Sequence, residues 1–568
     1  MAVDYPDTGA DVQSWIQAFP LSSIAPNQSK LFRKEKTQIA VWRLEDEVFA
    51  VDNRCPHEGY PLIQGALCEH VLTCSFHNFK FDLRDGRCLV GDEDVRTYAT
   101  RIVDGVIELD LTPEDPALAL DKRWQSLQDG LFDGKMGQVA RDVVRLRELG
   151  ISRVRIALAA AEFDARHAQY GTTHALPTAA DCLFWSGVLP LCQAMDVASR
   201  PNIRRPARER IEPMDPGPLT TFSDRLFSLV EAEDAAEAEA LVRGAVLSRW
   251  EREPIHNALL RLCCAHFLDF GHALIYVNKA FELFNQLENR HDDIRATILG
   301  ALVYRITYGT REDVLPAWKG WRKRVAAAAP EFAAWNRNTG PADGSVFRSR
   351  VLYGSGPQAT GAVVEALNAG ASPDAIAREL CVAGAERFFR FDHNIDIRRD
   401  VQDSWLSVTH IQTFCNAVRH ALPRMERPDR LRLLFQAARM IQHHGVLDAL
   451  ERTPIDPTSG DLLRAIATHD VAAAVGIAAG HLEDNLPLRT TLAKLVIEDP
   501  FTRPIFIAHG IKQTVAAFDD YRATGEPICV LALVRFLASP KRERRVARLA
   551  GEAERFVKTG AVPKLLAP

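Results

Sequence analysis

The sequence predicts a multidomain protein, in which a small antiparallel all-β domain is followed by a large all-α region. Short runs of alternating apolar residues, bounded by Asp, Asn and Gly, occupy the first fifth of the chain. Further along, stretches rich in Ala, Leu and Arg repeat their apolar residues at intervals of three and four. The length of 568 residues exceeds what one hydrophobic core can organise. We therefore expect a β domain over residues 1–112, a helical segment with a Pro-rich linker over 113–218, and an all-α domain over 219–568.

The strands of the first domain are predicted from alternation with period two. Four runs show it, and turn-forming residues separate them, as in antiparallel sheets. The runs are 38–42, 48–51, 96–100 and 106–109.

Two segments between the second and third of these runs carry the residues with the most specific chemistry. The first contains Cys55-Pro56-His57, and sixteen residues later follows Cys74-Ser75-Phe76-His77. Two thiolates and two imidazoles suit a [2Fe-2S] cluster in which two Cys hold one iron and two His the other, and they also suit a tetrahedral zinc ion. A Cys-x-His pair is too close for the usual zinc finger, so the spacing favours the iron–sulfur cluster.

The residues around these pairs resemble the two cluster-binding loops of Rieske proteins. The first loop runs from Asp52 to Gly65, and the second continues through Asn78-Phe79-Lys80-Phe81-Asp82 to Gly86. The resemblance implies that Cys55 and Cys74 bind a buried iron, while His57 and His77 bind an outer iron that faces a redox partner.

Two positions in the loops indicate which Rieske subclass the chain resembles. High-potential members carry one further Cys in each loop, and these two form a disulfide; the matching positions here hold Tyr60 and Phe76. The resemblance is therefore to the lower-potential ferredoxins and oxygenase domains, which pass electrons to oxygen-activating iron.

Composition excludes some classes of function. With 47% hydrophobic and 25% charged residues and a net charge of −5, the chain lacks the basic excess of a nucleic-acid-binding protein. Its acidic start does not fit a secretory signal, and no apolar run reaches membrane-spanning length, so we expect a cytoplasmic protein with no membrane partner. The eleven Cys show no disulfide framework, and we expect most to be reduced and buried.

The all-α region has clear helical segments and two interruptions. Residues 234–242 have helical spacing, whereas 201–218 is rich in Pro and 336–361 is rich in Gly and Ser; we expect loops at both interruptions. No phosphate-binding loop or nicotinamide fingerprint occurs. Reducing equivalents must therefore arrive from an external ferredoxin or flavin reductase.

Several His residues lie in apolar helical stretches with carboxylates at i, i+3 spacing. This spacing puts both side chains on one helical face, as in helical di-iron proteins. Asp396, Asp400 and Asp403 also share a predicted helical stripe with His410, which suits either a solvated surface or a binding site. The candidate second-site groups are Glu253, His256, His266, Asp269, His272 and His410, with His509 as a further candidate.

The same His residues give the helical region a resemblance to questin-oxidase-like proteins between Thr220 and Ala523. The segments that carry it are Pro254–Leu259, Gly271-His272, Thr409-His410 and Ala508–Lys512. The resemblance implies a helical protein that oxidises aromatic, polyketide-type molecules.

We interpret the chain as a Rieske-type oxidoreductase, and as an oxygenase in particular. The cluster would relay electrons to an oxidation site in the helices, which acts on an apolar or aromatic small molecule. The helical groups would act there as ligands of a second, non-haem iron or as acid/base residues of a metal-free pocket. A ferredoxin-like carrier with a helical docking scaffold and a [2Fe-2S] redox sensor stay open as alternatives, and so does a homo-oligomeric state.

Overall fold

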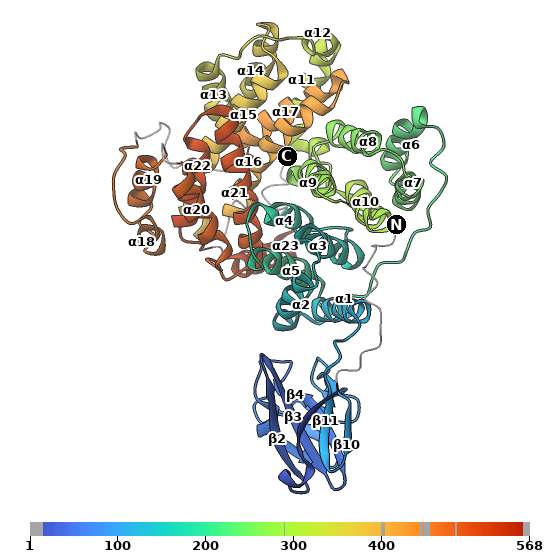
Figure 1. Ribbon diagram of the computed structural model, residues 1–568. Coiled ribbons are helices and arrows are strands. Elements are labelled where there is room, and N and C mark those ends of the chain that lie inside the picture. The colour runs from blue at the N-terminus through green and yellow to red at the C-terminus, as the bar shows by residue number, and fades with distance from the viewer. Residues whose placement is uncertain are drawn as a thin grey trace. The chain divides into compact units, whose positions relative to one another are not determined.

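The computed structural model divides by its contacts into two compact units. The first comprises residues 1–130 and 135–151, and the second comprises 131–134 and 152–568. Figure 1 shows that strands build the N-terminal part and helices build the rest, as predicted. The domain limits at 112 and 218 stay predictions. The structure describes residues 15–288, 290–398, 404–443, 447, 455–482, 485–542 and 544–560.

The β domain consists of three antiparallel sheets, with strand orders β1-β11-β10, β2-β3-β4-β9 and β5-β6-β7-β8. All four predicted runs form strands at or within a residue or two of the expected positions. The strands are β1 (Trp15–Pro20), β2 (Gln28–Lys34), β3 (Thr37–Leu44), β4 (Glu47–Asp52), β5 (Ala66–Cys68), β6 (Val71–Thr73), β7 (Lys80–Asp82), β8 (Cys88–Val90), β9 (Thr97–Tyr98), β10 (Thr100–Val103) and β11 (Val106–Asp110).

Alternation along β3 gives this domain two hydrophobic cores. Ile39 and Val41 pack into one core, while Ala40 and Trp42 pack into the other, because successive side chains of a strand point to opposite faces. The second core also contains Cys55 and Cys74. The loops that carry the Cys-His pairs are thus fixed to the interior of the sheet.

Two helices belong to the same unit as the sheets. They are α2 (Met136–Glu148) and α1 (Pro116–Asp133), the latter up to Gly130. Charge holds α2 to the loop after β8. The buried Glu93 carboxylate accepts hydrogen bonds from Arg141 at 3.1 Å and from Arg145 at 2.9 Å, and Arg145 also pairs with buried Asp142. The β domain therefore carries a helical extension.

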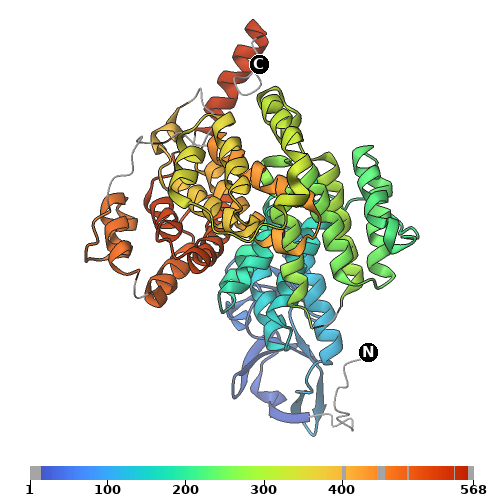
Figure 2. The same cartoon turned by 90° about the horizontal axis from the view of Figure 1, so that it is seen from above.

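The second unit is built from helices (Figures 1 and 2). The first of them are α3 (Arg153–His167), α4 (Ala175–Asp181), α5 (Leu189–Ser199), α6 (Leu219–Glu231), α7 (Ala235–Leu247), α8 (Arg252–Ala265), α9 (His272–Asn285), α10 (Asp292–Tyr308), α11 (Lys319–Ala328), α12 (Phe332–Trp335), α13 (Gly344–Tyr353) and α14 (Gly356–Asn368). The others are α15 (Pro373–Phe389), α16 (Trp405–Ala421), α17 (Arg432–His443), α18 (Leu462–Ala467), α19 (Val471–Gly480), α20 (Asn485–Ile497), α21 (Pro504–Thr524), α22 (Ile528–Ala538) and α23 (Arg545–Thr559).

Four of these helices form the centre of the unit. α9 packs on α4 and α16, and α21 packs on α4 and α16, so the four close into a ring of neighbours. Most of their residues are buried, including polar ones such as Thr409, Gln412 and Gln513. A polar interior of this kind is expected around a site rather than in a purely structural core.

One of the two predicted interruptions is wrong. Residues 204–218 contain no helix, as expected, but the Gly- and Ser-rich stretch 336–361 holds all of α13 and the start of α14. Ser355 caps α14 together with Gln358, and Pro357 lies in the first turn, where its missing N–H costs nothing. The Ser and Pro that predicted a loop here therefore mark the start of a helix instead.

The helices that the structure describes include none long and apolar enough to cross a membrane.

The Glu93 ion network generates a prediction about stability. Glu93→Leu leaves two arginines without their buried carboxylate, and we expect it to lower the free energy of unfolding of the first unit by about 2–3 kcal/mol. Denaturant unfolding followed by near-ultraviolet circular dichroism measures this change. Glu114→Leu, which removes an exposed ion pair with Lys122, is the matched control and should change stability little. Equal effects of the two substitutions would contradict the network's role.

Candidate functional site

The two Cys-His segments form adjacent tight turns in the β domain. The backbone N–H of Cys55 donates to the carbonyl of Tyr60 at 2.9 Å, and that of Cys74 donates to the carbonyl of Phe79 at 2.8 Å. Ser75 Oγ joins the turns by donating to the carbonyl of Gln64 at 2.8 Å. The two loop tips predicted to meet are therefore neighbours.

The four predicted cluster ligands come together, with the sulfurs inside and the imidazoles outside. Cys55 and Cys74 are buried, and their thiols contact each other. The Nδ1 atoms of the half-buried His57 and the exposed His77 lie 3.1 Å apart. Burial raises the pKa of the Cys55 thiol to about 11, so a thiolate there requires a compensating cation. Buried sulfur and exposed imidazole donors fit an asymmetric [2Fe-2S] cluster.

Aromatic side chains surround the imidazole end of this site. Phe79 stacks on His57 with ring centroids 4.5 Å apart, and Phe76, which is 55% exposed, lies 3.9 Å from His77. Tyr60 stacks on Phe76 at 5.4 Å. All eleven Cys lie within the described part of the chain, and all are free.

A second group of ligands lies in the helical unit, where four His converge from four elements. The residues are His174 at the start of α4, His272 at the start of α9, His410 in α16 and His509 in α21. The ring centroids of neighbouring members lie 4.3 to 5.9 Å apart. Ligand nitrogens of His174, His272 and His410 all lie within 4.8 Å of one another, which suits one metal ion.

Hydrogen bonds fix which nitrogen two of these imidazoles present to the centre. His272 Nδ1 donates to the carbonyl of Asp269, which leaves Nε2 facing His174 Nε2 at 3.2 Å. The Thr409 hydroxyl donates to the carbonyl of Leu406, so it accepts from His509 Nδ1 at 2.8 Å. Both His therefore keep Nε2 as an acceptor. In metal sites, a hydrogen bond from the other ring nitrogen of a ligating His fixes the tautomer in the same way.

The loop before His174 is held by a buried carboxylate. Asp164 accepts hydrogen bonds from the Thr172 hydroxyl, from both the backbone and the hydroxyl of Thr173, and from Asn202, at 2.7 to 3.0 Å. Burial raises the pKa of Asp164 although these donors oppose the shift. This network sets where His174 lies.

The turn before His272 needs glycine. Gly271 has φ +81°, and a Cβ on it would lie 2.4 Å from the ring of Phe414. Phe270 also has a positive φ, of 58°. The strained turn ends η5 (Asp269–Gly271) and starts α9 with His272 at the site.

Electrostatics keep the four His neutral. Burial lowers the pKa of His174, His272, His410 and His509 well below the usual value, and nearby cationic groups add to the effect. Neither ring nitrogen of His410 has a hydrogen-bond partner among the described residues. Neutral imidazoles with free acceptor nitrogens are the form that binds a metal.

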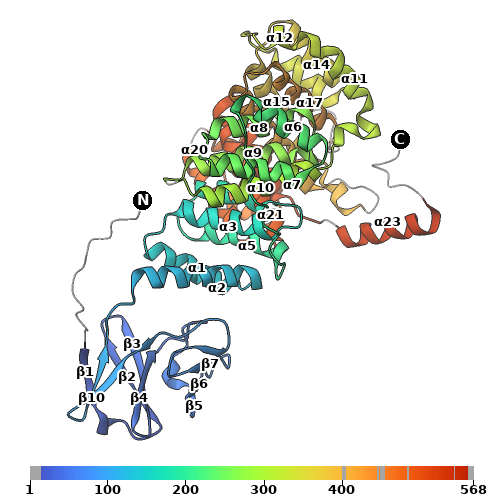
Figure 3. The ribbon, with the colours of Figure 1, turned by 90° about the vertical axis from the view of Figure 1, so that its right-hand side faces the viewer.

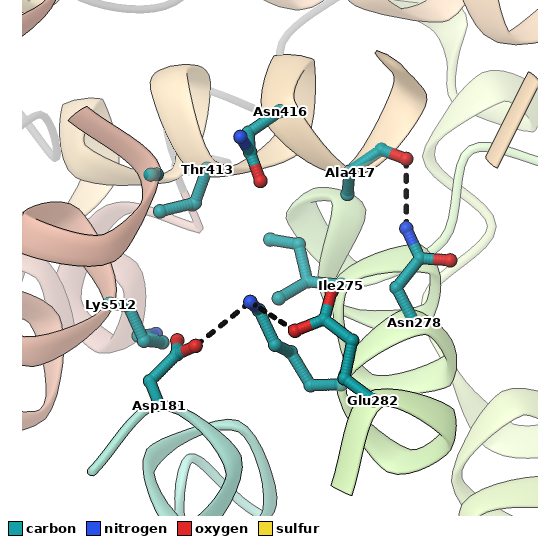
Figure 4. A pocket seen from close by; sticks show the side chains of 10 residues that line it. Asp181, Ile275, Asn278, Glu282, Thr413, Asn416, Ala417 and Lys512 are labelled. Atoms are coloured by element: carbon teal, nitrogen blue, oxygen red, sulfur yellow. Dashed lines mark hydrogen bonds and ion pairs between the residues drawn. The ribbon is translucent and has the colours of Figure 1, made fainter. Parts of the chain in front are cut away.

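A small polar pocket lies beside this group (Figure 4). Lys279 Nζ bridges Asp181 at 2.8 Å and Glu282 at 2.7 Å. Lys512 also lines the pocket and points toward Asp181 in Figure 4, and burial lowers its pKa to about 7. An amine of this kind is a weak base at neutral pH, so it is available for proton transfer.

The sequence candidates divide between this site and other positions. His272 and His410 belong to the four-His group, and the backbone of Asp269 positions His272 while its carboxylate pairs with Arg305. His266 instead pairs with Asp313, and His256 stacks on Phe281 at 4.0 Å. Glu253 is exposed at the start of α8.

Sequence reasoning missed His174 altogether. It stands in Gly171-Thr172-Thr173-His174, a segment with no carboxylate or second His at helical spacing. The nearby Asp164 gave no signal because its partners are hydroxyl, amide and backbone groups, none of them a charged or metal-binding side chain. Of the predicted Asp stripe, Asp396 lies in a 3-10 segment (His393–Ile397) and accepts from the backbone of Arg542, while Asp400 and Asp403 lie outside the described residues.

Comparison with known proteins gives matches for the N-terminal domain. A family model for the Rieske [2Fe-2S] domain matches residues 14–99. The anthranilate 1,2-dioxygenase ferredoxin subunit of Burkholderia cepacia is 37% identical over 75 residues, which are 13% of this chain and 69% of that protein. The ferredoxin component of the naphthalene 1,2-dioxygenase system of Pseudomonas putida is 28% identical over 100 residues, or 17% of this chain and 96% of its own length.

Similarity also extends to a larger enzyme and to solved structures. The 4beta-methylsterol monooxygenase of Methylococcus capsulatus is 36% identical over 108 residues, which are 17% of this chain and 29% of that enzyme. The ferredoxin of carbazole 1,9a-dioxygenase from Nocardioides aromaticivorans is 24% identical, covering 17% of this chain and 96% of its own, with a TM-score of 0.16. These matches cover the β domain and leave the helices unmatched.

The His266–Asp313 ion pair generates a prediction with a definite pH dependence. Burial lowers the pKa of His266, but the Asp313 hydrogen bond and charge outweigh it and raise the pKa overall. The pair therefore stabilises the fold fully below the unfolded-state pKa of about 6.5, and its contribution is lost as pH rises through the folded-state pKa. His266→Gln should cost about 1–2 kcal/mol at about pH 5.5 and less at about pH 8.5. Urea unfolding at both pH values measures it, and a larger loss at the higher pH would contradict the assignment.

Proposed function

The chain belongs to the Rieske [2Fe-2S] proteins through its N-terminal domain, and we propose that this domain supplies electrons to an oxygenase-type centre in the helical unit. The convergence of His174, His272, His410 and His509 supports this proposal most. A scaffold that only docks partners gains nothing from bringing together four neutral imidazoles, three of them buried and one half-buried, because burying polar groups without partners costs stability.

The helical donor set fits a non-haem metal ion. Imidazole suits iron, copper, zinc and nickel, and redox function in a chain with a Rieske cluster favours iron. When bound, such an ion supplies oxygen-activating chemistry. The chain's own residues hold the imidazoles as neutral donors, through Asp269 for His272 and through Thr409 for His509. The hydroxyl of buried Tyr276 has no hydrogen-bond partner among the described residues, and its ring lies 5.3 Å from that of His272, so it can donate to a substrate at the same place.

Electrons would enter at the imidazole end of the site in the β domain. His77 is exposed beside the exposed ring of Phe76, and His57 is half-buried, and this arrangement suits brief contact with another redox protein. The chain shows no nicotinamide- or nucleotide-binding fingerprint. We therefore propose an external ferredoxin or flavin reductase as the donor.

We propose an apolar, aromatic small molecule as the substrate. The names of the matched relatives point to oxidation of ring systems such as naphthalene, anthranilate and sterols. The resemblance of the His segments to questin-oxidase-like proteins leads to the same class. Lys512, a buried amine with a lowered pKa, is the candidate acid/base group near the site.

A second function, that of an electron carrier, is favoured by one specific observation. The ferredoxin relatives match the β domain over nearly their whole length, and they are carriers by name. This function predicts a [2Fe-2S] cluster and no metal among the helices.

Iron content separates the two functions. Anaerobically purified protein should hold about three irons per chain if the helical His bind one, and about two if only the cluster is present. His410→Ala should reduce about three irons to about two while the electron paramagnetic resonance signal of the reduced cluster is unchanged. His256→Gln is the matched control, since His256 is buried in the same unit outside the four-His group. A wild-type content of two irons would contradict the oxygenase proposal.

The cluster ligands are tested by exchanging an imidazole for a thiolate. His77→Cys adds negative charge next to the iron, which favours the oxidised state, so we expect the reduction potential to fall by about 100 mV or more, or the cluster to be lost. Voltammetry and visible circular dichroism measure both outcomes. His70→Cys, on a half-buried His beside Phe49, is the control and should change neither property. A His77→Cys protein with unchanged iron and potential would overturn the ligand assignment.

A further inference from the structure

The C-terminal helix α23 carries its apolar residues on the outside. Val546, Leu549, Phe556 and Val557 are 78%, 45%, 59% and 80% exposed. With Ala550 and Ala553, also exposed, they fall within about 120° of one helical face at 3.6 residues per turn. No residue of α23 is buried.

The opposite face of α23 is polar and half-buried. Arg548 pairs with Glu552 at 3.4 Å, and Arg555 Nε on this face is shielded from solvent. Figures 2 and 3 show the helix extending away from the other helices of its unit. A helix that packs on its own protein normally buries the apolar face, so this orientation is the reverse. The apolar stripe is therefore free to bind something else.

Charge around α23 indicates the chemistry of what binds there. Residues 542–559 contain six Lys and Arg against three Glu, a net of +3, in a chain whose net charge is −5. Arg542, Arg544 and Arg545 are exposed at the start of the helix, and Lys558 is exposed near its end. Basic residues that flank an apolar stripe match a surface that is apolar inside and anionic at its rim.

A second copy of the chain fits this helix less well. Two copies would bring two segments of like charge together. A single helix of 15 residues also provides only two heptads of seam, too short to hold a two-stranded pair in water by itself.

We propose that α23 binds the surface of an anionic lipid bilayer, lying in the plane of the interface with its apolar stripe in the headgroup boundary. The side chains of Val546, Leu549, Phe556 and Val557 enter the boundary, and the flanking arginines contact lipid phosphates. Such a helix lies in the interface and does not span the bilayer. The expectation of no membrane partner rested on the lack of an apolar run of spanning length, and this kind of binding needs no such run. The inference does not depend on the proposed reaction.

Vesicle co-sedimentation of the full-length protein tests the proposal. We expect binding to vesicles of phosphatidylcholine mixed with phosphatidylglycerol, at least about fivefold weaker binding to phosphatidylcholine alone, and weakening at high salt. The double variant Leu549→Ser and Phe556→Ser should reduce binding about tenfold or more, because two apolar side chains no longer enter the boundary.

Matched control variants distinguish an effect of the α23 stripe on vesicle binding from an effect of exposed apolar side chains in general. Val346→Ser with Leu463→Ser removes side chains of similar exposure, 57% and 49%, on α13 and α18, and should leave vesicle binding unchanged. Circular dichroism of each variant verifies that the fold is kept. Absence of binding to anionic vesicles, equal binding to both vesicle types, or equal loss in the control variant would overturn the proposal. So would a dimer, detected by light scattering, that the α23 variant abolishes, since this would assign the stripe to a second copy.

Discussion

Four uncharged imidazoles in one buried space are the constraint on which the centre of the helical unit depends. If protonated, they would repel one another and lose their acceptor nitrogens, so burial and shared neutrality are conditions for the group to exist. Each His comes from a different element, and the helices α4, α9, α16 and α21 must pack around them. The Asp164 network and the Gly271 turn are the local devices that hold two of the four in place.

The two proposed centres use opposite arrangements of similar donors. In the β domain the thiols are buried, His57 is half-buried and His77 is exposed, which places the proposed electron entry at the surface. In the helical unit His272, His410 and His509 are buried and His174 is half-buried, and hydrogen bonds orient His272 and His509. The proposed relay thus pairs a redox group near the surface with an enclosed one.

Sequence predicted the β domain well because its signals are local. Alternation in residues 38–42 and 48–51 predicted strands that the structure contains, and the two Cys-His pairs predicted four candidate ligands that lie close together. The helical site was predicted only in part. His272 and His410 were named for their spacing to carboxylates, yet their partners in space are His174 and His509, more than ninety residues away. Such convergence depends on tertiary packing, about which the spacing of residues within one helix carries no information. The loop prediction for the Gly-rich start of α14 was wrong for another reason, because helix caps and loops use the same residue types.

The attachment of α2 to the loop after β8 bears on where the first unit can be separated from the rest of the chain. The family match ends at residue 99, but Glu93 within it accepts hydrogen bonds from Arg141 and Arg145. A fragment that ended at residue 99 would leave a buried carboxylate without its two arginines. The smallest piece that keeps this network intact therefore extends through α2, close to the limit of the first unit at Ile151.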